Sequence, residues 1–533
     1  MKNINPFLCV DGYKIHHGKM SPEGTSMIYS NFTPRSNKYA PKGCNEVLVF
    51  GTQMTIREIV SNFKENFFMT DYLQTIADIS LDKEYEKAVL SLKNEICGNI
   101  KKEYSMYSNT DYDVSKIEAL WDLGYLPIKV KALPEGEFCP MGVPVLTIYN
   151  TLPEFAWVTN FLETMISNLL WKPMTSATLG YEFKKLNDKW IAKTDKGNDF
   201  HSQYGCHDFS MRGMDSLYAT MSSGLGHAVS FLGSDSLPVI HAAREYYDEK
   251  EFVVGSIPAT EHSIQCAYYH KESTDYNYVK TLIERFPTGP LGIVSDGFDL
   301  WKLITEVLPQ LKEQIMSRTG GPVVIRPDSG NPADIICGRG LTKRERVDYG
   351  GEGLKSKHKG VIELLWDIFG GTTNAQGYKV LHPSIRMIYG DAINLERFEE
   401  INTRLEAKGF ASTNWVAGIG SFTYQFNTRD TFGFAMKSTY QEVTHLSNNG
   451  RIGFTEGINI FKDPITDDGT KKSAKGLLKV EKTSDAIDEY SYLLKDQVSW
   501  DEENQGFLKV IFEDGKFYNQ ITLTEIRNKI NNL

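Results

Sequence analysis

From about residue 205 onward, short apolar runs end abruptly in clusters of polar, charged and glycine residues, and helical segments follow them. Marker residues in successive clusters lie 26 to 34 residues apart, except for one step of 63 between Asp328 and Asp391. A strand–helix unit takes about 30 residues, so the spacing predicts successive parallel strands joined by helices. The clusters are HDFSMRG (207–213), FLGSD (231–235), SIPATEH (256–262), IVSDGFD (293–299), VVIRPDSGNP (323–332), MIYGD (387–391) and WVAGIGS (415–421).

This regular spacing limits the chain to folds in which the carboxyl ends of parallel strands lie along the same edge of a sheet. A β/α barrel with its site at those ends would produce the pattern, and so would an open, doubly wound sheet. The six or seven repeats favour the barrel. The 63-residue step contains an insertion at about 334–376, rich in glycine and lysine, with a helix expected at 361–369.

The regions before about residue 150 and after about residue 430 show strand and turn signals instead. Residues 127–133 alternate apolar side chains with lysine, which predicts a half-buried strand, and 143–149 predict a second one. We expect these two strands at the edge of an antiparallel or mixed sheet. Residues 154–171 carry apolar side chains at helical spacing, so an amphipathic core helix is expected there, ending before Pro173.

Composition argues against several classes of protein. The 58 Lys and Arg against 68 Asp and Glu give a net charge of −10, whereas a nucleic-acid binder depends on many cation–phosphate contacts. No apolar run of about 18 residues suggests a membrane span, and the first residues lack the apolar core of a signal peptide. The seven cysteines never form a CxxC pair, so we expect a reduced, cytoplasmic protein.

Strand-end aspartates are the first candidates for chemistry. Each could be a helix N-cap, but several of them facing one barrel mouth would make an anionic pocket suited to sugar hydroxyls, Mg²⁺ or an amide donor. Arg326 leaves its strand beside one of them and offers a fork for phosphate oxygens, unless it forms a structural ion pair. The aspartates are Asp235, Asp296, Asp328 and Asp391.

His262 could act as a general base, a metal ligand or a phosphate-accepting nucleophile, or be a hydrogen-bonded core residue. No HExxH or HxH spacing supports zinc. Gly418 and Gly420, beside Ser421, could free backbone N–H groups for a phosphate. Tyr13 and Phe209 could stack on a flat heteroaromatic ring or belong to a core.

Several of these motifs occur in one order across nearly the whole chain. Together they resemble the nicotinamide phosphoribosyltransferase family, which is a type II phosphoribosyltransferase family. The motifs are DGYK at Tyr13, HDFSMRG, GSD at Asp235, IPATEHS, VSDGFD, IRPDSGNP, GD at Asp391, TRD at Arg429 and FKDP at Lys462.

The resemblance implies an irregular β/α barrel with a second α+β sheet domain formed from both chain ends. Residues 1–180 and 429–533 would form the sheet domain, and 181–428 the barrel. It implies a homodimer with active sites at the subunit interface. It further implies Mg²⁺-dependent phosphoribosyl transfer from 5-phosphoribosyl 1-pyrophosphate to nicotinamide, giving nicotinamide mononucleotide and pyrophosphate. ATP would phosphorylate His262 as a coupling step.

The same resemblance assigns residue roles. Phe209 and the partner subunit's Tyr13 would sandwich the pyridine ring, and Asp235 would accept a hydrogen bond from the carboxamide. Arg326 would contact the carbonyl or the pyrophosphate. Asp296 and Asp328 would bind ribose hydroxyls and order the Mg²⁺ that pyrophosphate carries. The phosphoribosyl pocket would be lined by Gly390, Asp391, Gly420 and Ser421, with phosphates held by Arg212, Arg429, Lys437, Lys462 and Arg35.

Two positions depart from the family pattern. Ser421 stands where the family's glycine run continues, and Ala435 replaces a serine two residues before the phosphate lysine, removing a donor worth about 1 kcal/mol. Two other functions compete with the first. One is the same transfer to nicotinate, which the Asp235 carboxylate disfavours. The other is a non-catalytic binding protein on the same scaffold, which would have no need of His262, Asp296, Asp328 and Arg326 together.

Overall fold

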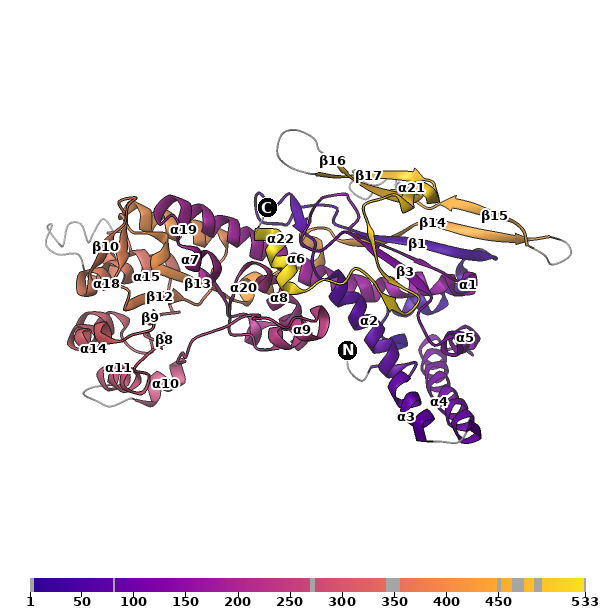
Figure 1. Cartoon of the computed structure of the whole chain (residues 1–533), viewed down its shortest axis with the longest axis horizontal. Helices are drawn as coiled ribbons and strands as arrows, with labels where there is room; N and C mark the ends of the chain where they lie inside the picture. Colours follow the sequence, from indigo (N-terminus) through magenta and orange to yellow (C-terminus); the bar gives the residue numbers. More distant parts are fainter. Residues whose placement is uncertain are drawn as a thin grey trace. The chain divides into compact units, whose positions relative to one another are not determined.

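The computed structural model describes residues 4–79, 82–268, 274–341, 355–447, 452–462, 474–483 and 491–531. The chain divides into two compact units, both drawn in Figure 1. The first unit contains Met1–Thr175, Arg244–Glu249 and Thr428–Leu533, and the second contains Ser176–Ala243 and Lys250–Asn427. The two ends of the chain therefore build one unit, and most of the middle builds the other.

The second unit is built on a six-stranded sheet in which every neighbouring pair is parallel, in the order β7-β6-β13-β12-β9-β8. Each strand overlaps the start of one polar cluster or lies within it, so the predicted succession of parallel strands is confirmed. The cluster at 256–262 is the exception, because its segment forms only isolated bridges. The apolar side chains of these strands are almost entirely buried in one core, as expected where helices cover a parallel sheet. The strands are β6 (Cys206–Asp208), β7 (Gly233–Ser234), β8 (Leu291–Val294), β9 (Val323–Arg326), β12 (Ile385–Tyr389) and β13 (Trp415–Ile419).

A stretch at 255–260 joins the two edges of this sheet. Gly255 forms a parallel bridge to Gly233 in β7, and Ala259 forms one to Gly292 in β8. An open doubly wound sheet leaves its edge strands apart, whereas here one segment pairs with both edges. The sheet is therefore curled into an irregular barrel, and the barrel prediction is confirmed.

Helical segments follow the strands. Their starts are set locally: the Ser216 side chain accepts from the N–H of Ala219, and the Asn394 side chain accepts from the N–H of Arg397. The segments are α7 (Asp199–Tyr204), η4 (Met211–Gly213), α8 (Leu217–Ser230), α9 (Pro238–Tyr247), α10 (His262–Ala267), α11 (Thr274–Arg285), α12 (Leu300–Lys302), η5 (Leu303–Val307), α13 (Leu308–Gln310), α14 (Lys312–Ser317), α19 (Leu395–Ala407), η6 (Ser412–Asn414) and α20 (Ser421–Tyr424).

The expected insertion at 334–376 contributes to the barrel core. Its predicted helix is present as α18 (Val361–Phe369), whose apolar residues pack into the same core as the strands. The neighbouring elements are α15 (Pro332–Cys337), α17 (Ser356–Lys359), β10 (Gly371–Thr373) and β11 (Lys379–Leu381). Residues 342–354 of the insertion lie outside the described residues.

The first unit holds a seven-stranded antiparallel sheet in the order β15-β14-β1-β5-β3-β18-β19, with strands from both chain ends. The prediction of a sheet domain formed by the two ends is therefore confirmed. The predicted edge position of the two early strands is wrong, because β1 and β18 flank the pair β5–β3 and all of β5 is buried. The strands are β1 (Thr25–Thr33), β3 (Ile128–Ala132), β5 (Leu146–Asn150), β14 (Ala435–Leu446), β15 (Ile452–Asn459), β18 (Lys509–Glu513) and β19 (Lys516–Phe517).

Helices and the two-stranded sheets β16–β17 and β2–β4 complete the first unit. The predicted helix at 154–171 does not end at Pro173 but continues as α6 (Ala156–Thr194). An interior proline costs about 3 kcal/mol, and burial of residues on both sides of it in α6 outweighs that cost. No helix within the described part of the chain is long and apolar enough to cross a membrane. The other elements are η1 (Pro6–Leu8), η2 (Gly12–His16), α1 (His17–Met20), β2 (Glu46–Leu48), α2 (Thr52–Asn66), α3 (Thr70–Ile79), α4 (Asp82–Ser108), α5 (Ser115–Leu123), β4 (Phe138–Pro140), η3 (Pro153–Phe155), η7 (Arg429–Thr431), β16 (Leu477–Thr483), β17 (Ser491–Val498), α21 (Trp500–Asn504) and α22 (Leu523–Asn531).

Candidate active site

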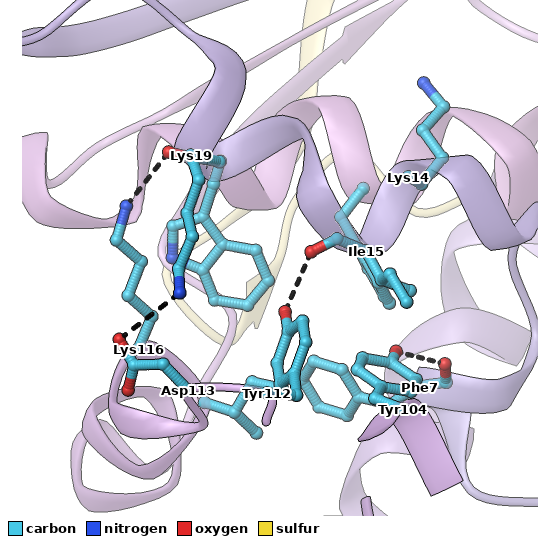
Figure 2. A pocket seen from close by; sticks show the side chains of 12 residues that line it. Phe7, Lys14, Ile15, Lys19, Tyr104, Tyr112, Asp113 and Lys116 are labelled. Carbon is cyan, nitrogen blue, oxygen red and sulfur yellow. Dashed lines mark hydrogen bonds and ion pairs between the residues drawn. The ribbon is translucent and has the colours of Figure 1, made fainter. Parts of the chain in front are cut away.

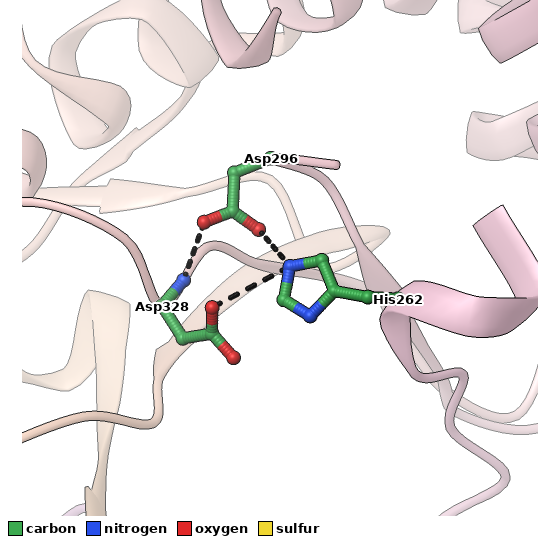
Figure 3. Close-up of side chains that lie close together, drawn as sticks. All are labelled: His262, Asp296 and Asp328. Atoms are coloured by element: carbon green, nitrogen blue, oxygen red, sulfur yellow. Dashed lines mark hydrogen bonds and ion pairs between the residues drawn. The ribbon is translucent and has the colours of Figure 1, made fainter. Parts of the chain in front are cut away.

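A histidine and two aspartates meet at the carboxyl ends of β8 and β9 (Figure 3). His262 is the first residue of α10, and Asp296 and Asp328 each follow their strand by two residues. The His262 Nε2 atom lies 3.0 Å from Oδ1 of Asp296 and 3.5 Å from Oδ1 of Asp328. Backbone N–H groups of Asp328 and Ser329 donate to Oδ2 of Asp296 at 2.9 and 2.7 Å. The three side chains predicted from separate clusters thus share one site.

The pKa values of the two carboxyl groups in this cluster are shifted in opposite directions. Burial opposes the charge of Asp296, but the hydrogen bonds from Asp328, Ser329 and His262 outweigh it, so its pKa is lowered. Burial raises the pKa of Asp328, and the nearby charge of Asp296 raises it further. Because an ionised carboxylate only accepts hydrogen bonds, Nε2 of His262 must carry the proton that points to Asp296.

A second group of site residues surrounds Asp235, directly after β7. Nε2 of His207 lies 2.9 Å from Oδ1 of Asp235, and the Ser256 hydroxyl donates to the same oxygen. The His207 ring packs against Phe209 with 4.8 Å between ring centroids. The guanidinium carbon of Arg326 lies 4.9 Å from the Phe209 centroid. An aromatic ring, a cation and a carboxylate are therefore assembled from β6, β7 and β9.

The glycines of β12 and β13 make room for this aromatic ring. A Cβ on Gly418 would lie 2.5 Å from Cδ2 of Phe209 and 2.7 Å from Cα of Gly390, which no real structure tolerates. Gly418 is thus explained by packing under Phe209 rather than by a phosphate. A Cβ on Gly420 would meet nothing within 4 Å. Gly420 precedes the short helix α20, and the role of its N–H stays a prediction.

The remaining predicted residues of the second unit lie around the same loops. Ser421 starts α20, and its Oγ is in contact with Gly213, since a Cβ there would collide with it. Asp391 is exposed after β12 and is close enough to Asp328 to raise its pKa. Arg212 is exposed in η4.

The predicted cations of the first unit gather around β14. Burial lowers the pKa of Lys437, and the charges of Arg35, Lys462 and Arg429 lower it further against a weaker opposing effect of Glu163. Lys437 therefore lies near three further cations, and a cluster of positive charge attracts anions. Arg35 is oriented by its Nε–H, which donates to the Gly433 carbonyl at 3.0 Å.

Ala435, the first residue of β14, is buried and lies opposite Thr33 in β1. Ala435 and Lys437 are two residues apart on β14, and Ala435 occupies the position where the family pattern has a serine.

Tyr13 also belongs to the first unit, and 63% of it is exposed, so it is not a core residue. Its neighbours hold the segment in place: the Lys14 ammonium pairs with Glu163 at 2.5 Å, and the Tyr112 hydroxyl donates to the Ile15 carbonyl at 2.8 Å. Figure 2 shows the cavity beneath this segment, which has a volume of about 40 Å³ and is lined largely by aromatic side chains. Such a volume admits a few water molecules and no nucleotide.

Sequence reasoning missed His207 and Ser256 as members of the site. Both were visible as the first residues of polar clusters, but the clusters did not show which side chains would meet. His207 and Ser256 are 28 and 21 positions away from Asp235, and they reach it because β6 and the segment at Gly255 both pair with β7.

The strand-end residues of the barrel thus form a candidate enzyme site in which an aromatic ring lies beside a carboxylate and a guanidinium group. Residues 204–513 match the nicotinate phosphoribosyltransferase (NAPRTase) family. Proteins named nicotinamide phosphoribosyltransferase are similar over nearly their whole length. The one from Acinetobacter baylyi is 41% identical over 536 residues, covering 99% of this chain and 97% of the relative. Those from Mycoplasma pneumoniae and Xanthomonas campestris pv. campestris are both 30% identical, covering 89% and 98% of this chain and 95% and 97% of the relatives.

The chain therefore belongs to the nicotinate phosphoribosyltransferase family. It is an enzyme of the pentosyltransferase class.

Proposed function

We propose that this enzyme transfers a phosphoribosyl group from 5-phosphoribosyl 1-pyrophosphate to nicotinamide. The ring nitrogen forms a bond to the anomeric carbon, and the bond from that carbon to the pyrophosphate oxygen breaks. The electron pair leaves with pyrophosphate, and nicotinamide mononucleotide is the other product. The names of the similar proteins support this reaction, which would place the enzyme in the salvage of nicotinamide for NAD biosynthesis.

The observation that carries the choice of nicotinamide is the held carboxylate of Asp235. Burial opposes its charge, but the hydrogen bond and charge of His207, the Ser256 hydroxyl and the charge of Arg326 lower its pKa. An ionised carboxylate accepts a hydrogen bond from an amide. It repels the carboxylate of nicotinate by about 1–4 kcal/mol at 4 Å, for effective dielectric constants of 80 to 20. Phe209 would stack on the pyridine ring, and Arg326 would contact the carbonyl or pyrophosphate.

Charge separation supports the sugar chemistry. Departure of pyrophosphate leaves a cation-like sugar, so anions are needed around the ribose and cations around the leaving group. Asp296 and Asp328 would bind ribose hydroxyls, with Gly390, Asp391, Gly420 and Ser421 lining the pocket. The phosphates would be held by the exposed or half-buried cations Arg212, Arg429, Lys437, Lys462 and Arg35.

The carboxylates also fit the Mg²⁺ that the family implies. Mg²⁺ prefers oxygen ligands and keeps several waters, and Asp328 has a carboxyl group whose charge is disfavoured by burial and by Asp296. A cation would offset that repulsion, so Asp328 and Asp296 would hold the ion together with pyrophosphate. When bound, Mg²⁺ neutralises charge on the leaving group.

His262 has the geometry of an activated histidine. Its Nε2–H is directed at the Asp296 carboxylate, which leaves the lone pair on Nδ1. Within the described residues no hydrogen bond to Nδ1 is found. We therefore propose that ATP phosphorylates His262 and that this step is coupled to the main reaction, as the resemblance implies. His262→Ala should abolish an acid-labile phosphoenzyme formed with ATP, and a label that persists in this variant would contradict the role.

Tyr13 and the cations around Lys437 belong to the first unit, whereas the carboxylates belong to the second. We propose a homodimer in which Tyr13 and several phosphate-binding cations reach the site from the partner subunit. No disulfide joins two cysteines of the described residues, which is in keeping with the expectation of a reduced, cytoplasmic setting.

The decisive experiment incubates the enzyme with phosphoribosyl pyrophosphate, Mg²⁺ and either nicotinamide or nicotinate. Formation of nicotinamide mononucleotide, with a preference over nicotinate in kcat/KM, is expected. Asp235→Ser should narrow that preference. Equal use of both rings by the wild type would indicate that Asp235 does not select the substrate. Absence of any mononucleotide at micromolar enzyme would favour a non-catalytic binding protein.

A further inference from the structure

The carboxylate of Asp235 is held at one oxygen only. Both donors that reach it, Nε2 of His207 and the hydroxyl of Ser256, contact Oδ1. They come from different places in the barrel, His207 from β6 and Ser256 from the segment that joins the two sheet edges. Among the described residues no donor reaches Oδ2. The carboxylate is therefore anchored from two sides while its second oxygen keeps its full capacity to accept.

The support is more rigid than the group it supports. Only 12% of the His207 side chain is exposed, against 41% of the Asp235 side chain. The imidazole lies close over β7, because a Cβ on Gly233 would come within 2.7 Å of its Nδ1. Its other side packs against Phe209. A buried ring held between a strand and an aromatic side chain can fix the direction of the carboxylate that it contacts.

Asp235 and Ser256 also line one cavity of about 200 Å³, which contains no large charged group besides Asp235. Its other walls include the apolar side chains of Leu237, Ile240 and Val254. Ser234 and Ser236 also line it, so Asp235 is the charged acceptor among the polar side chains that line this cavity. The orientation of the carboxylate therefore decides which hydrogen bond a ligand can make here.

We propose that His207 and Ser256 are positioning residues that keep Asp235 ionised and aim its Oδ2 at the amide N–H of the substrate. Asp235, His207 and Ser256 would then together determine the selectivity for nicotinamide, which is uncharged, over nicotinate, which carries a carboxylate. Without its two donors, Asp235 could take up a proton and share it with a carboxylate ring. This inference rests on the proposed nicotinamide transfer and identifies two further residues that determine it.

The test compares kcat and KM for nicotinamide and for nicotinate in five variants and the wild type. His207→Leu should raise the nicotinamide KM about tenfold, the size expected for one hydrogen bond to a charged group, with kcat changed far less. The nicotinamide-to-nicotinate ratio of kcat/KM should narrow by a similar factor. His207→Gln, which can still donate to Oδ1, should restore most of the ratio. Ser256→Ala should narrow it about threefold to fivefold.

Ser202→Ala is the matched control, because the Ser202 hydroxyl also donates to an aspartate, Asp188, at 2.7 Å. It should leave the ratio unchanged. A purely structural role for His207 would lower kcat/KM for both rings equally, and that result would overturn the inference. If His207→Leu does not fold, the nicotinamide-to-nicotinate ratio of kcat/KM is compared in His207→Gln and Ser256→Ala instead. An unchanged ratio in Ser256→Ala overturns the inference.

Failure of the inference and failure of the proposed function give different results. If Asp235→Asn narrows the ratio and neither His207→Leu nor Ser256→Ala does, Asp235 acts without its supports and only the inference fails. If the wild type does not form nicotinamide mononucleotide, or if Asp235→Asn leaves the ratio unchanged, the assignment of Asp235 fails, and the inference fails with it.

Discussion

The carboxyl edge of the parallel sheet and the neighbourhood of β14 differ in the sign of their charge and in how that charge is held. At the sheet edge, hydrogen bonds from neighbouring groups favour the ionised forms of Asp235 and Asp296 and lower their pKa values despite burial. Around β14, burial and neighbouring cations lower the pKa of Lys437 and so disfavour its charge. Hydrogen-bond donors of this chain already hold the first two anions, whereas burial and like charges disfavour the charge of Lys437.

This difference assigns the two regions different tasks. Satisfied carboxylates have a fixed direction, which suits recognition of an amide or a sugar hydroxyl. Crowded cations gain most when a phosphate arrives between them, which suits affinity for the phosphorylated substrate. Asp328 is the exception at the sheet edge, because its pKa is raised by burial and by Asp296. Asp328 resembles Lys437 in that its surroundings disfavour its charged form, so a ligand of opposite charge would stabilise it.

The largest effect is expected for Asp328→Asn. Loss of the charge that we propose binds Mg²⁺ and ribose should lower kcat/KM by about a hundredfold to a thousandfold. Its melting temperature should stay the same or rise, because the substitution removes repulsion with Asp296. Steady-state kinetics and thermal unfolding measure the two quantities. Asp296→Asn is the comparison: it should lose activity and also stability, since His262 and two backbone N–H groups are directed at Asp296.

An Asp328→Asn enzyme with nearly normal kcat/KM would show that the charge of this carboxylate is not needed to bind a cation. The contrast with the satisfied carboxylates would then have no functional meaning.

The next effect is expected for Lys437→Met. Removal of one charge-assisted phosphate contact should raise the KM for phosphoribosyl pyrophosphate about tenfold to a hundredfold, with a smaller change in the KM for nicotinamide. Lys495→Met is a matched control, because Lys495 is 61% exposed and pairs with Glu481 on a hairpin. Equal KM changes for both substrates in Lys437→Met would contradict a dedicated phosphate region around β14.

A smaller effect separates packing from phosphate binding among the strand-end glycines. Gly418→Ala should reduce the free energy of unfolding by about 1–3 kcal/mol, since its Cβ would displace the Phe209 ring. Gly420→Ala should be tolerated in urea unfolding, because a Cβ there meets nothing within 4 Å. The opposite order of stabilities would show that the barrel mouth is not packed as the structure has it.

The smallest effect concerns the pH dependence of stability, where Asp235 and Asp328 have opposite signs. The folded-state pKa of Asp235 lies below its ordinary value of 3.8, so its stabilising contribution is present above that value and lost as the pH falls through the lowered pKa. The pKa of Asp328 is raised above 3.8, so its contribution is present below 3.8 and lost as the pH rises through the raised pKa.

Urea unfolding should be measured at several pH values between about 3 and 6. The free energy of unfolding of Asp235→Asn should be lower than that of the wild type at the upper end of this range, and the difference should shrink as the pH falls. Asp328→Asn should gain on the wild type as the pH rises through the same range. Both differences should stay below about 1 kcal/mol, because solvent screens partly exposed groups. The same sign for both variants would contradict the distinction between a satisfied and an unsatisfied carboxylate.

The barrel strands were predictable because their signal is local. Each apolar run ends where its polar cluster begins, so the strand and the site residue after it are read from fewer than ten neighbouring residues. The helix at 361–369 was predictable for the same reason. The central position of β3 and β5 was not, because it depends on β1 and β18, which are distant in the sequence. The course of α6 through Pro173 likewise depends on packing that no local pattern records.

The sequence by itself determined which chemical groups the site contains, their order along the chain and the strand ends that carry them. Only the tertiary structure decided which donors contact the same carboxylate oxygen. Oδ1 of Asp235 receives His207 and Ser256, and Oδ2 of Asp296 receives the backbone of Asp328 and Ser329. Hydrogen bonds and charge effects act over a few ångströms, whereas these partners are 21 to 33 residues apart. Parallel pairing of neighbouring strands is what brings these distant residues into contact.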